Sequence, residues 1–379
     1  MASILLVTND FGPRAGGIET FVIGLLERVP RGEVLVYTST QENSENFDQL
    51  WREKYEVQII RDRAKILLPT PRVVRNLRKV IRQRNLETIW FGAAAPLGFS
   101  ARWLRKAGAT HIVALTHGHE VWWSKIWPFS WAMKEIARSV DIATYLGEFT
   151  RSAIAPRFSD PRKLIKIAPG IDTEHFKPRN VENLRKSLGL DNRPTIVCVG
   201  RLVHRKGQDR LVEAMPAILK RFPDAALVFV GEGPHRAHLE KLVKVKKVEK
   251  FVQFIGRIQY INLPEYIAIG DIFAMPSRSR FFGLEVEGLG IVYLEASACG
   301  LPVIGGDSGG APDAVKHGET GFVVDGNDVE AITHRIIQLL ADKKLRDEMG
   351  SAGRQWAIQE WSWERWSQAF NNALNIADK

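Results

Sequence analysis

The chain contains the stretch Glu287-Gly-Leu-Gly-Ile-Val-Tyr-Leu-Glu-Ala-Ser-Ala-Cys-Gly-Leu-Pro-Val-Ile304, in which a glycine-rich turn precedes a helix and an apolar strand. Such a turn leaves backbone N–H groups free at a helix N-terminus, where the helix dipole favours an anion such as a diphosphate. Glu287 precedes the turn and Glu295 follows it, a separation of about 12 Å along a helix. The two carboxylates are predicted to hold hydroxyls at opposite ends of one elongated ligand, which describes a nucleotide sugar.

Outside this stretch, short apolar strands alternate with helices, a pattern that predicts parallel α/β sheets. In the first half we predict strands at 4–8, 33–38, 88–91, 111–115 and 142–145, with helices at 19–28, 73–83 and 129–140. In the second half we predict strands at 194–200, 226–230, 252–255, 272–275 and 302–304, with a helix at 210–221. Two Rossmann-like units with ligands at the strand carboxyl ends are therefore expected.

The turn-rich segment Ala168-Pro-Gly-Ile-Asp-Thr-Glu-His-Phe-Lys-Pro178 is a predicted connector between domains. It places an N-terminal domain at 1–170 and a C-terminal domain at 171–361. The tail, about 362–379, is a predicted helix that crosses back onto the first domain. In and before this tail, Trp356, Trp361 and Trp366 are expected in the core, and ligand contact is the alternative.

Composition fits a globular protein, with 45% hydrophobic and 25% charged residues in 379. No apolar run approaches the roughly 18 residues of a membrane-spanning helix, and the N-terminus is predicted to be a strand, not a signal peptide. The two cysteines, Cys198 and Cys299, offer no disulfide or metal framework. We therefore expect a cytoplasmic enzyme without a bound metal.

Positive charge is concentrated in the first half of the chain. Residues 1–179 hold 27 Lys/Arg against 18 Asp/Glu, which is +9 of the net +10. The densest part is the segment 61–84, where nine basic residues face only Asp62 and include Arg72, Arg75, Arg78 and Lys79. Such a patch attracts nucleic acid or an anionic membrane, and a solvated helix face is the alternative. Nucleic acid is not expected, because the basic, aromatic-interleaved strands of common RNA-binding modules are absent.

A second segment, 121–131, is rich in tryptophan and includes Trp122, Trp123 and Trp127. Tryptophan favours the headgroup region of a bilayer, so the segment resembles a membrane-interface anchor. A buried aromatic cluster is the alternative. Together with the basic segment, it favours peripheral binding to an anionic bilayer.

Two further motifs follow predicted strands. Arg201 and Lys206 lie between a strand and a helix, where two cations neutralise a diphosphate without a metal, unless they are ordinary surface charges. Gly16 and Gly17 follow the first strand and allow backbone to approach a phosphate or sugar closely, although a plain turn explains them too. They do not form Gly-x-Gly-x-x-Gly, which weakens a dinucleotide-dehydrogenase interpretation.

The segment Thr116-His-Gly-His-Glu120 also follows a predicted strand. A histidine there donates to a sugar hydroxyl or binds a metal. The His-Glu-x-x-His zinc pattern is absent, so sugar contact is favoured. A structural role is the alternative, especially for His119.

Together, the two glutamates, the Arg201/Lys206 pair, Gly16-Gly17 and His117 resemble the retaining family 4 glycosyltransferases of the GT-B fold. The runs Thr8-Asn-Asp-Phe11, Trp90-Phe-Gly-Ala-Ala-Ala-Pro96 and Glu287–Ala296 are similar to an actinobacterial subgroup of GDP-mannose-dependent mannosyltransferases that act on phosphatidylinositol monomannoside. The resemblance implies two facing Rossmann-like domains around a central cleft. The first would bind the acceptor and the second the nucleotide sugar.

The resemblance also implies roles for individual residues. Glu287 would hold sugar hydroxyls, with the backbone N–H groups of Leu289, Gly290 and Ile291, and Glu295 would hold the ribose. The other donor and catalytic contacts would be Arg201, Lys206 and Gly16 at the diphosphate, backbone near Arg257 at the base, and His117 at the reacting face. The acceptor and membrane contacts would be Asn9, Asp10, His119, Trp122, Trp123, Trp127, Arg72, Arg75, Arg78 and Lys79.

The implied reaction moves a hexose, mannose from GDP-mannose in the favoured case, to a lipid-linked polyol with retention of configuration. The nucleotide sugar is the co-substrate, no metal is needed, and the enzyme lies on the inner face of the cell membrane. A UDP-sugar-dependent family member, a nucleotide-sugar 2-epimerase and a non-catalytic scaffold are alternatives. The chain departs from the family at Pro169 and, as Arg280-Phe-Phe, from a glycine-rich loop of the subgroup, which leaves sugar and acceptor open. Sequence does not address the oligomeric state.

Overall fold

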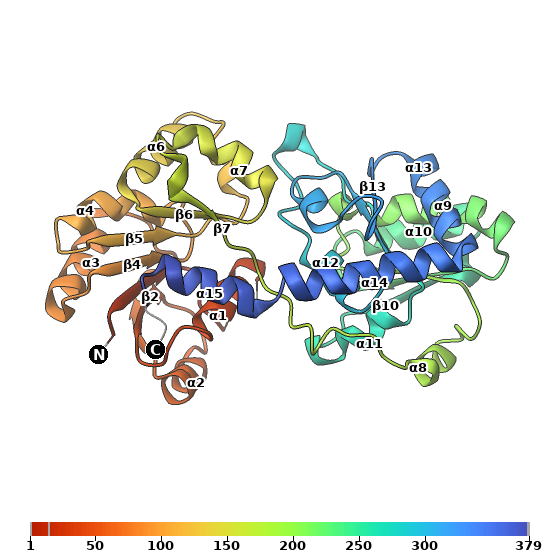
Figure 1. Ribbon diagram of the computed structural model, residues 1–379, viewed down its shortest axis with the longest axis horizontal. Coiled ribbons are helices and arrows are strands. Elements are labelled where there is room, and N and C mark those ends of the chain that lie inside the picture. Colours follow the sequence, from red (N-terminus) through yellow and green to blue (C-terminus); the bar gives the residue numbers. More distant parts are fainter. Residues whose placement is uncertain (1, 14–15, 377–379) are drawn as a thin grey trace. The chain divides into compact units, whose positions relative to one another are not determined.

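The computed structural model describes residues 2–13 and 16–376. The chain forms two compact units, one of residues 1–170 with 364–379 and one of residues 171–363 (Figure 1). The second unit thus ends at Trp363, two residues beyond the expected 361. Within the described residues, no helix has both the length and the apolar character needed to cross a bilayer.

The first unit is built on a seven-stranded parallel sheet of order β3-β2-β1-β4-β5-β6-β7. Ile4 of β1 is in register with Val34 of β2 and Thr88 of β4. The strands are β1 (Ile4–Thr8), β2 (Val34–Ser39), β3 (Gln58–Asp62), β4 (Thr88–Phe91), β5 (His111–Ala114), β6 (Ile142–Tyr145) and β7 (Leu164–Lys166). The central strand β1 is buried along its whole length, as expected for a parallel sheet covered on both faces.

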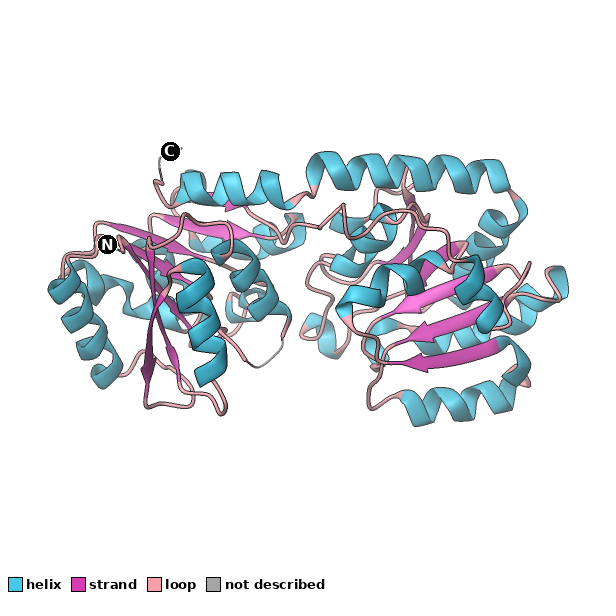
Figure 2. Cartoon of the chain, turned by 90° about the horizontal axis from the view of Figure 1, so that it is seen from below, coloured by secondary structure: helices cyan, strands magenta, loops and turns pink. Residues whose placement is uncertain are grey.

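Helices cover both faces of this sheet (Figure 2). They are α1 (Gly17–Leu26), α2 (Glu45–Tyr55), α3 (Pro71–Arg84), α4 (Ala101–Arg105), α5 (Glu120–Trp123), α6 (Phe129–Ser139), α7 (Glu148–Ile154) and α15 (Trp363–Ala373), with 3-10 turns η1 (Leu97–Ser100), η2 (Ala155–Arg157) and η3 (Pro161–Lys163). α3 begins at a Thr70 side-chain cap with proline at its first position. Its apolar face, including Leu77 and Ile81, joins the buried core.

The C-terminal helix α15 belongs to the first unit although it follows the second in sequence. The ring of Phe370 meets Trp90 of β4 with centroids 4.7 Å apart. A ring nitrogen of His111 lies 2.7 Å from the carbonyl oxygen of Ala373. The returning helix thus contacts the sheet at both β4 and β5.

The second unit is built on a six-stranded parallel sheet of order β10-β9-β8-β11-β12-β13. Its strands are β8 (Thr195–Val199), β9 (Ala226–Val230), β10 (Val252–Gly256), β11 (Ile272–Met275), β12 (Val303–Gly306) and β13 (Gly321–Val324). Its helices are α8 (Glu182–Ser187), α9 (Gln208–Arg221), α10 (Arg236–Lys246), α11 (Leu263–Ala268), α12 (Ile291–Ala298), α13 (Val329–Ala341) and α14 (Lys343–Glu360), with η4 (His204–Lys206), η5 (Glu249–Phe251), η6 (Tyr260–Asn262), η7 (Phe281–Gly283) and η8 (Ala311–Ala314).

Two glycines fix the loops that carry the functional residues of this unit. Gly207 has φ +74°, and a Cβ there would lie 2.0 Å from the carbonyl oxygen of Pro276. Gly290 has φ +80°, and a Cβ there would lie 2.3 Å from the ring of Tyr293. Only glycine fits either position, so the loop after β8 and the turn before α12 each have one tight path.

The expected tryptophan core is largely present. Trp361 and Trp366 are buried, whereas Trp356 is half-buried and packs its ring 5.6 Å from that of Trp361. The prediction of core residues is therefore confirmed for Trp361 and Trp366, and Trp356 packs at the edge of that core.

Candidate active site

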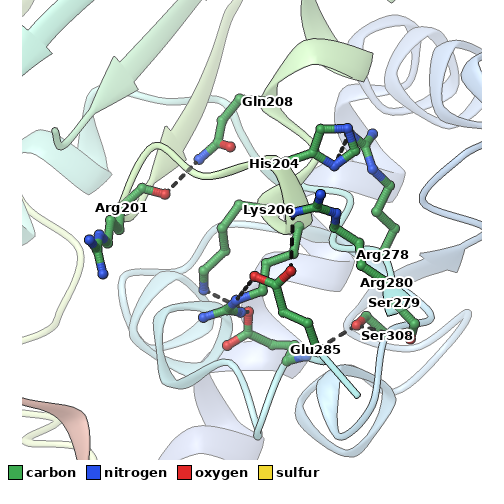
Figure 3. A network of polar contacts seen from close by, with 11 residues as sticks. Arg201, His204, Lys206, Gln208, Arg278, Ser279, Arg280, Glu285 and Ser308 are labelled. Carbon is green, nitrogen blue, oxygen red and sulfur yellow. Dashed lines mark hydrogen bonds and ion pairs between the residues drawn. The ribbon is translucent and has the colours of Figure 1, made fainter. Parts of the chain in front are cut away.

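In the second unit, the carboxyl ends of the strands carry a compact group of charged side chains (Figure 3). Arg205 Nη1 lies 2.5 Å and Lys206 Nζ lies 2.7 Å from the same Glu287 oxygen, Oε2. Glu287 is only 7% exposed. Burial alone would raise the pKa of Glu287, but Lys206 and Arg205 outweigh it and hold that pKa below its ordinary value. The carboxylate is thus kept ionised in a buried setting.

The backbone of Glu287 is fixed by the loop that follows β12. Its N–H donates to Ser308 Oγ at 3.1 Å, and its carbonyl accepts from Gly310 N at 2.8 Å. After Glu287 the chain turns through Gly290 into α12, whose first N–H groups have no acceptor within the helix. A fixed carboxylate therefore lies beside a helix N-terminus that favours an anion.

Glu295 lies on α12, as the spacing predicts, but Glu287 lies before that helix. Residues 287–290 precede the helix, which begins at Ile291, so a helical rise does not apply to them. Burial raises the pKa of Glu295 to about 7, and Lys206 opposes that rise. The pKa values of the two carboxylates shift in opposite directions because Lys206 and Arg205 pair directly with only one of them.

Arg201 does not join the Glu287 group. Its side chain is exposed and points away from Lys206 (Figure 3), and its carbonyl accepts from Gln208 Nε2 at 3.2 Å. Arg257 is exposed as well and follows Gly256 at the carboxyl end of β10. Both lie at the same edge of the sheet as Lys206, but neither forms part of the ion-pair group.

Sequence reasoning missed two cations that matter to this group. Arg205 pairs with Glu287, and the only signal was its place next to Lys206 after a strand. Arg278 is 2% exposed and braces the same loop from the carboxyl end of β11. Its Nη2 donates to Asp209 Oδ2 at 2.8 Å and lies 2.9 Å from His204 Nδ1, while its N–H donates to the carbonyl of Arg205 at 2.8 Å. No local motif marks this residue.

In the first unit, the polar residue His117 follows β5 and is neutral, unlike the charged group around Glu287. His117 Nε2 lies 2.6 Å from the carbonyl oxygen of Gly92, and the His117 N–H donates to Glu120 Oε2 at 2.9 Å. Burial lowers the pKa of His117, so the ring is neutral near pH 7. A neutral ring that donates from Nε2 to Gly92 leaves Nδ1 as an acceptor. The ring thus offers an acceptor to a ligand, whereas the sequence predicted a donor, and the contact of His117 with a sugar stays a prediction.

Family models match both halves of the chain. One described as "Glycosyl transferases group 1" matches residues 180–356, and one described as "Glycosyltransferase Family 4" matches residues 15–175. The "GDP-mannose-dependent alpha-(1-6)-phosphatidylinositol monomannoside mannosyltransferase" of Mycolicibacterium smegmatis is 44% identical over 364 residues, which is 95% of each chain. The chain belongs to glycosyltransferase family 4.

Another relative of this glycosyltransferase is the "GDP-mannose-dependent monoacylated alpha-(1-6)-phosphatidylinositol monomannoside mannosyltransferase" of Corynebacterium glutamicum. It is 41% identical over 374 residues, 98% of this chain and 97% of its own. Among solved structures, Anabaena HepE in complex with UDP gives a TM-score of 0.82 at 18% identity over 100% of both chains. Sucrose-phosphate synthase from Thermosynechococcus elongatus gives 0.79 at 23% identity, over 99% of this chain and 98% of its own. These likenesses show the GT-B fold.

Two residues expected at the acceptor of this glycosyltransferase, Asn9 and His119, have contacts within the chain. Both ends of the Asn9 amide bond the backbone of Leu67, at 3.0 and 2.6 Å. His119 Nε2 lies 3.2 Å from the carbonyl oxygen of Ala95 and 3.3 Å from Glu120 Oε1. The alternative of a structural histidine fits His119 better than an acceptor contact.

Other predicted positions are open. Gly16 and Gly17 are exposed, and a Cβ at either would have nothing within 4 Å, so backbone there is accessible to a ligand. Asp10 is half-buried, and its N–H donates to Thr8 Oγ1 at 2.8 Å. Its carboxylate and the two glycines follow β1 at the carboxyl edge of the sheet.

The tryptophan segment divides between the two alternatives. Trp122 and Trp123 are half-buried and pack on Phe129, with ring centroids 5.0 and 4.9 Å apart. Trp127 is 80% exposed, and Trp131 is exposed as well. The first pair therefore belongs to a cluster, and the second pair forms surface.

The basic segment is divided too. Arg72 Nη2 pairs with Asp62 Oδ1 at 2.7 Å, and Arg61 Nη2 pairs with Asp48 Oδ1 at 2.6 Å. Arg72 thus holds the buried Asp62, and a contact of Arg72 with a membrane stays a prediction. Arg75 and Lys79 are exposed on α3, and Arg78 is half-buried.

No metal centre was found in the described part of the chain. There, no group of three or more His, Cys, Asp or Glu side chains is arranged to hold a metal ion. In the charged group around Glu287, Arg205 and Lys206 pair with that carboxylate, and these cations suit an anionic ligand.

Proposed function

We propose that this glycosyltransferase transfers mannose from GDP-mannose to a phosphatidylinositol mannoside and retains the anomeric configuration. The observation that carries the proposal is Glu287, buried and ionised between Arg205 and Lys206 beside the N-terminus of α12. Two relatives, 44% and 41% identical, bear names that specify GDP-mannose and a phosphatidylinositol mannoside.

The donor is assigned to the second unit. Lys206 and Arg205 supply positive charge for the diphosphate, and the first N–H groups of α12 add hydrogen-bond donors. Glu287, freed from its cations by the phosphates, accepts hydrogen bonds from sugar hydroxyls. Glu295 accepts from the ribose hydroxyls. Arg201 joins the diphosphate through a change of rotamer, because its exposed side chain is unrestrained by packing.

The reaction breaks the bond between the anomeric carbon and the β-phosphate oxygen, which leaves oxocarbenium character on the sugar. Cations at the phosphates lower this barrier by stabilising the departing charge. The acceptor hydroxyl then attacks on the face the diphosphate leaves, and its proton passes to the leaving phosphate oxygen. His117, as a neutral acceptor, orients a sugar hydroxyl during this step. No metal ion is required by this scheme.

The lipid acceptor places the enzyme at a membrane surface, on its anionic cytoplasmic face. Support comes from the exposed side chains of Trp127, Trp131, Arg75 and Lys79 in the first unit. Their combination of aromatic rings and positive charge suits an anionic headgroup layer.

The test uses purified protein, GDP-mannose and phosphatidylinositol monomannoside in vesicles. We expect mannose transfer with an α product by NMR. A thermal-shift series with GDP, UDP and ADP should show the largest increase for GDP. A β product, a larger shift with UDP, or an epimerised nucleotide sugar formed without acceptor would contradict the proposal.

A further inference from the structure

One loop of the second unit projects apolar side chains into solvent close to the donor group. Residues 280–285, here called the aromatic finger, form a closed turn between β11 and α12. Arg280 N–H donates to the Glu285 carbonyl at 2.9 Å, Glu285 N–H donates back at 3.2 Å, and Arg280 Nη1 pairs with Glu285 Oε2 at 3.1 Å. The base of the finger is therefore fixed by three contacts.

The tip of the finger is exposed and has an unfavourable backbone. Phe281 is 62% exposed, Phe282 108% and Leu284 51%. Phe281 has φ +49° and Phe282 has φ +55°, a left-handed conformation that costs free energy for any residue with a Cβ. The Arg280 guanidinium lies 4.7 Å from the Phe281 ring centroid. This contact covers only part of the Phe281 ring. Exposure and strain together are unfavourable unless the tip binds something.

We propose that the aromatic finger inserts into the interfacial layer of a phospholipid bilayer. This inference rests on the proposed function, because a lipid acceptor places the donor site at a membrane. A protruding tip with three apolar side chains can enter the interfacial region of the bilayer, where aromatic rings are favoured. Phe282 is the most exposed residue of the tip.

The charges at the base of the finger are paired, so membrane binding by the finger differs in salt dependence from binding by the basic face of α3. Arg280 is paired with Glu285, and Glu285 Oε1 also lies 3.8 Å from Arg205 Nε. The finger thus has little free charge, so its contribution to membrane binding is apolar and insensitive to salt. Binding by α3, through Arg75 and Lys79, weakens as salt rises.

The finger also contacts the charged group around Glu287. Arg205 contacts Glu285 at the finger base and pairs with Glu287 through Nη1. Only Val286 separates these two glutamates in sequence. Insertion of the tip therefore holds the sugar-binding carboxylate at a fixed depth beside the bilayer.

The test replaces both rings by glycine, as F281G/F282G. Glycine is unstrained at positive φ, so the thermal midpoint should be equal to or above that of the parent. Partitioning into phosphatidylcholine vesicles containing phosphatidylinositol should fall about tenfold, at low and at high salt alike. The matched control V245S/I261S removes two other exposed apolar side chains of the same unit, each 66% exposed, and should change partitioning less than twofold.

Two further measurements distinguish the finger from the reaction itself. The variant should keep the GDP-induced thermal shift and the rate with a water-soluble, short-chain acceptor, and lose rate only with acceptor in vesicles. Unchanged vesicle partitioning, an equal loss with the soluble acceptor, or a loss of binding to another protein without any vesicle effect would overturn the inference. Failure of the parent to transfer mannose at all would contradict the proposed function, whereas vesicle partitioning tests the finger without substrate.

Discussion

The carboxyl ends of the two sheets differ in how their polar side chains are held. In the second unit, Glu287 is ionised and paired with two cations. In the first unit, His117 is neutral and bonded to a backbone carbonyl. Burial opposes charge in both places, and only the nearby cations of the second unit overcome it. The fold is the same, but one edge suits an anionic ligand and the other suits uncharged hydroxyls.

Removal of the buried carboxylate should produce the largest effect and test the charged edge directly. Glu287→Gln keeps the shape of the side chain but loses the charge that accepts sugar hydroxyls. We expect turnover to fall about 10²–10³-fold, measured as mannose transfer at saturating donor. Glu319→Gln, an exposed carboxylate of the same unit, is the control and should leave the rate unchanged. A Glu287→Gln enzyme as fast as the parent would remove this residue from the site.

Loss of a cation should come next and sharpen the assignment of the diphosphate. Lys206→Gln is expected to weaken GDP binding about a hundredfold, because a charge-assisted contact to phosphate is lost. GMP, which lacks the second phosphate, should be affected far less. Lys220→Gln, on the exposed surface of α9, serves as control. Equal losses for GDP and GMP, by calorimetry, would place Lys206 away from the diphosphate.

The pH dependence of GDP binding tests the second carboxylate. Glu295 has a pKa raised to about 7, so it is protonated in the free enzyme below that pH. Ribose hydroxyls that donate to the ionised form favour loss of the proton, so affinity should rise with pH up to about 7 and then level off. The expected gain is roughly tenfold per pH unit below 7. In Glu295→Gln, GDP affinity should keep only the smaller dependence on pH that is due to ionisation of GDP itself. An identical pH dependence in the parent and the variant would exclude Glu295 from ribose binding.

The smallest effect concerns the neutral edge. Burial lowers the pKa of His117, so below about pH 6.5 the unfolded chain binds a proton there that the folded chain does not. Stability therefore falls as pH drops below 6.5 and is unaffected above it. His117→Gln should reduce this slope by about 1 kcal/mol per pH unit, measured by unfolding between pH 5 and 8. His204 and His235, whose pKa values burial also lowers, contribute the slope that remains.

Much of the fold could be predicted because central strands of a parallel sheet are continuous apolar runs. All ten predicted strands form within two residues of their expected bounds. The three strands that were missed, β3, β7 and β13, all lie at sheet edges. β3 reads Gln58-Ile-Ile-Arg-Asp62, and β7 has only three residues, so neither shows a central-strand pattern. These two edge strands bury less surface and need less apolar sequence, whereas β13 (Gly321–Val324) is apolar, short and largely buried.

The site was predictable where the signal is local. Gly290 and the strand–loop–helix around Lys206 indicated where the charged group around Glu287 lies, because positive φ and loop position leave marks in sequence. Arg205 and Arg278 were missed because their partners lie 82 and 69 residues away, at Glu287 and Asp209. The ion pair of Arg72 with Asp62 was missed for the same kind of reason: composition counts charges but does not reveal which of them are paired.

The way the chain passes twice between its units, at 170–171 and 363–364, has a consequence for proteolysis. Ile171 N–H donates to the Trp361 carbonyl at 2.7 Å, so the two passages are hydrogen-bonded together. Cleavage at the first passage divides the chain into residues 1–170 and a second fragment that carries α15. Residues 1–170 still pack against α15, so the two fragments stay associated. The nicked protein should therefore elute as one species from a sizing column and separate only in denaturant.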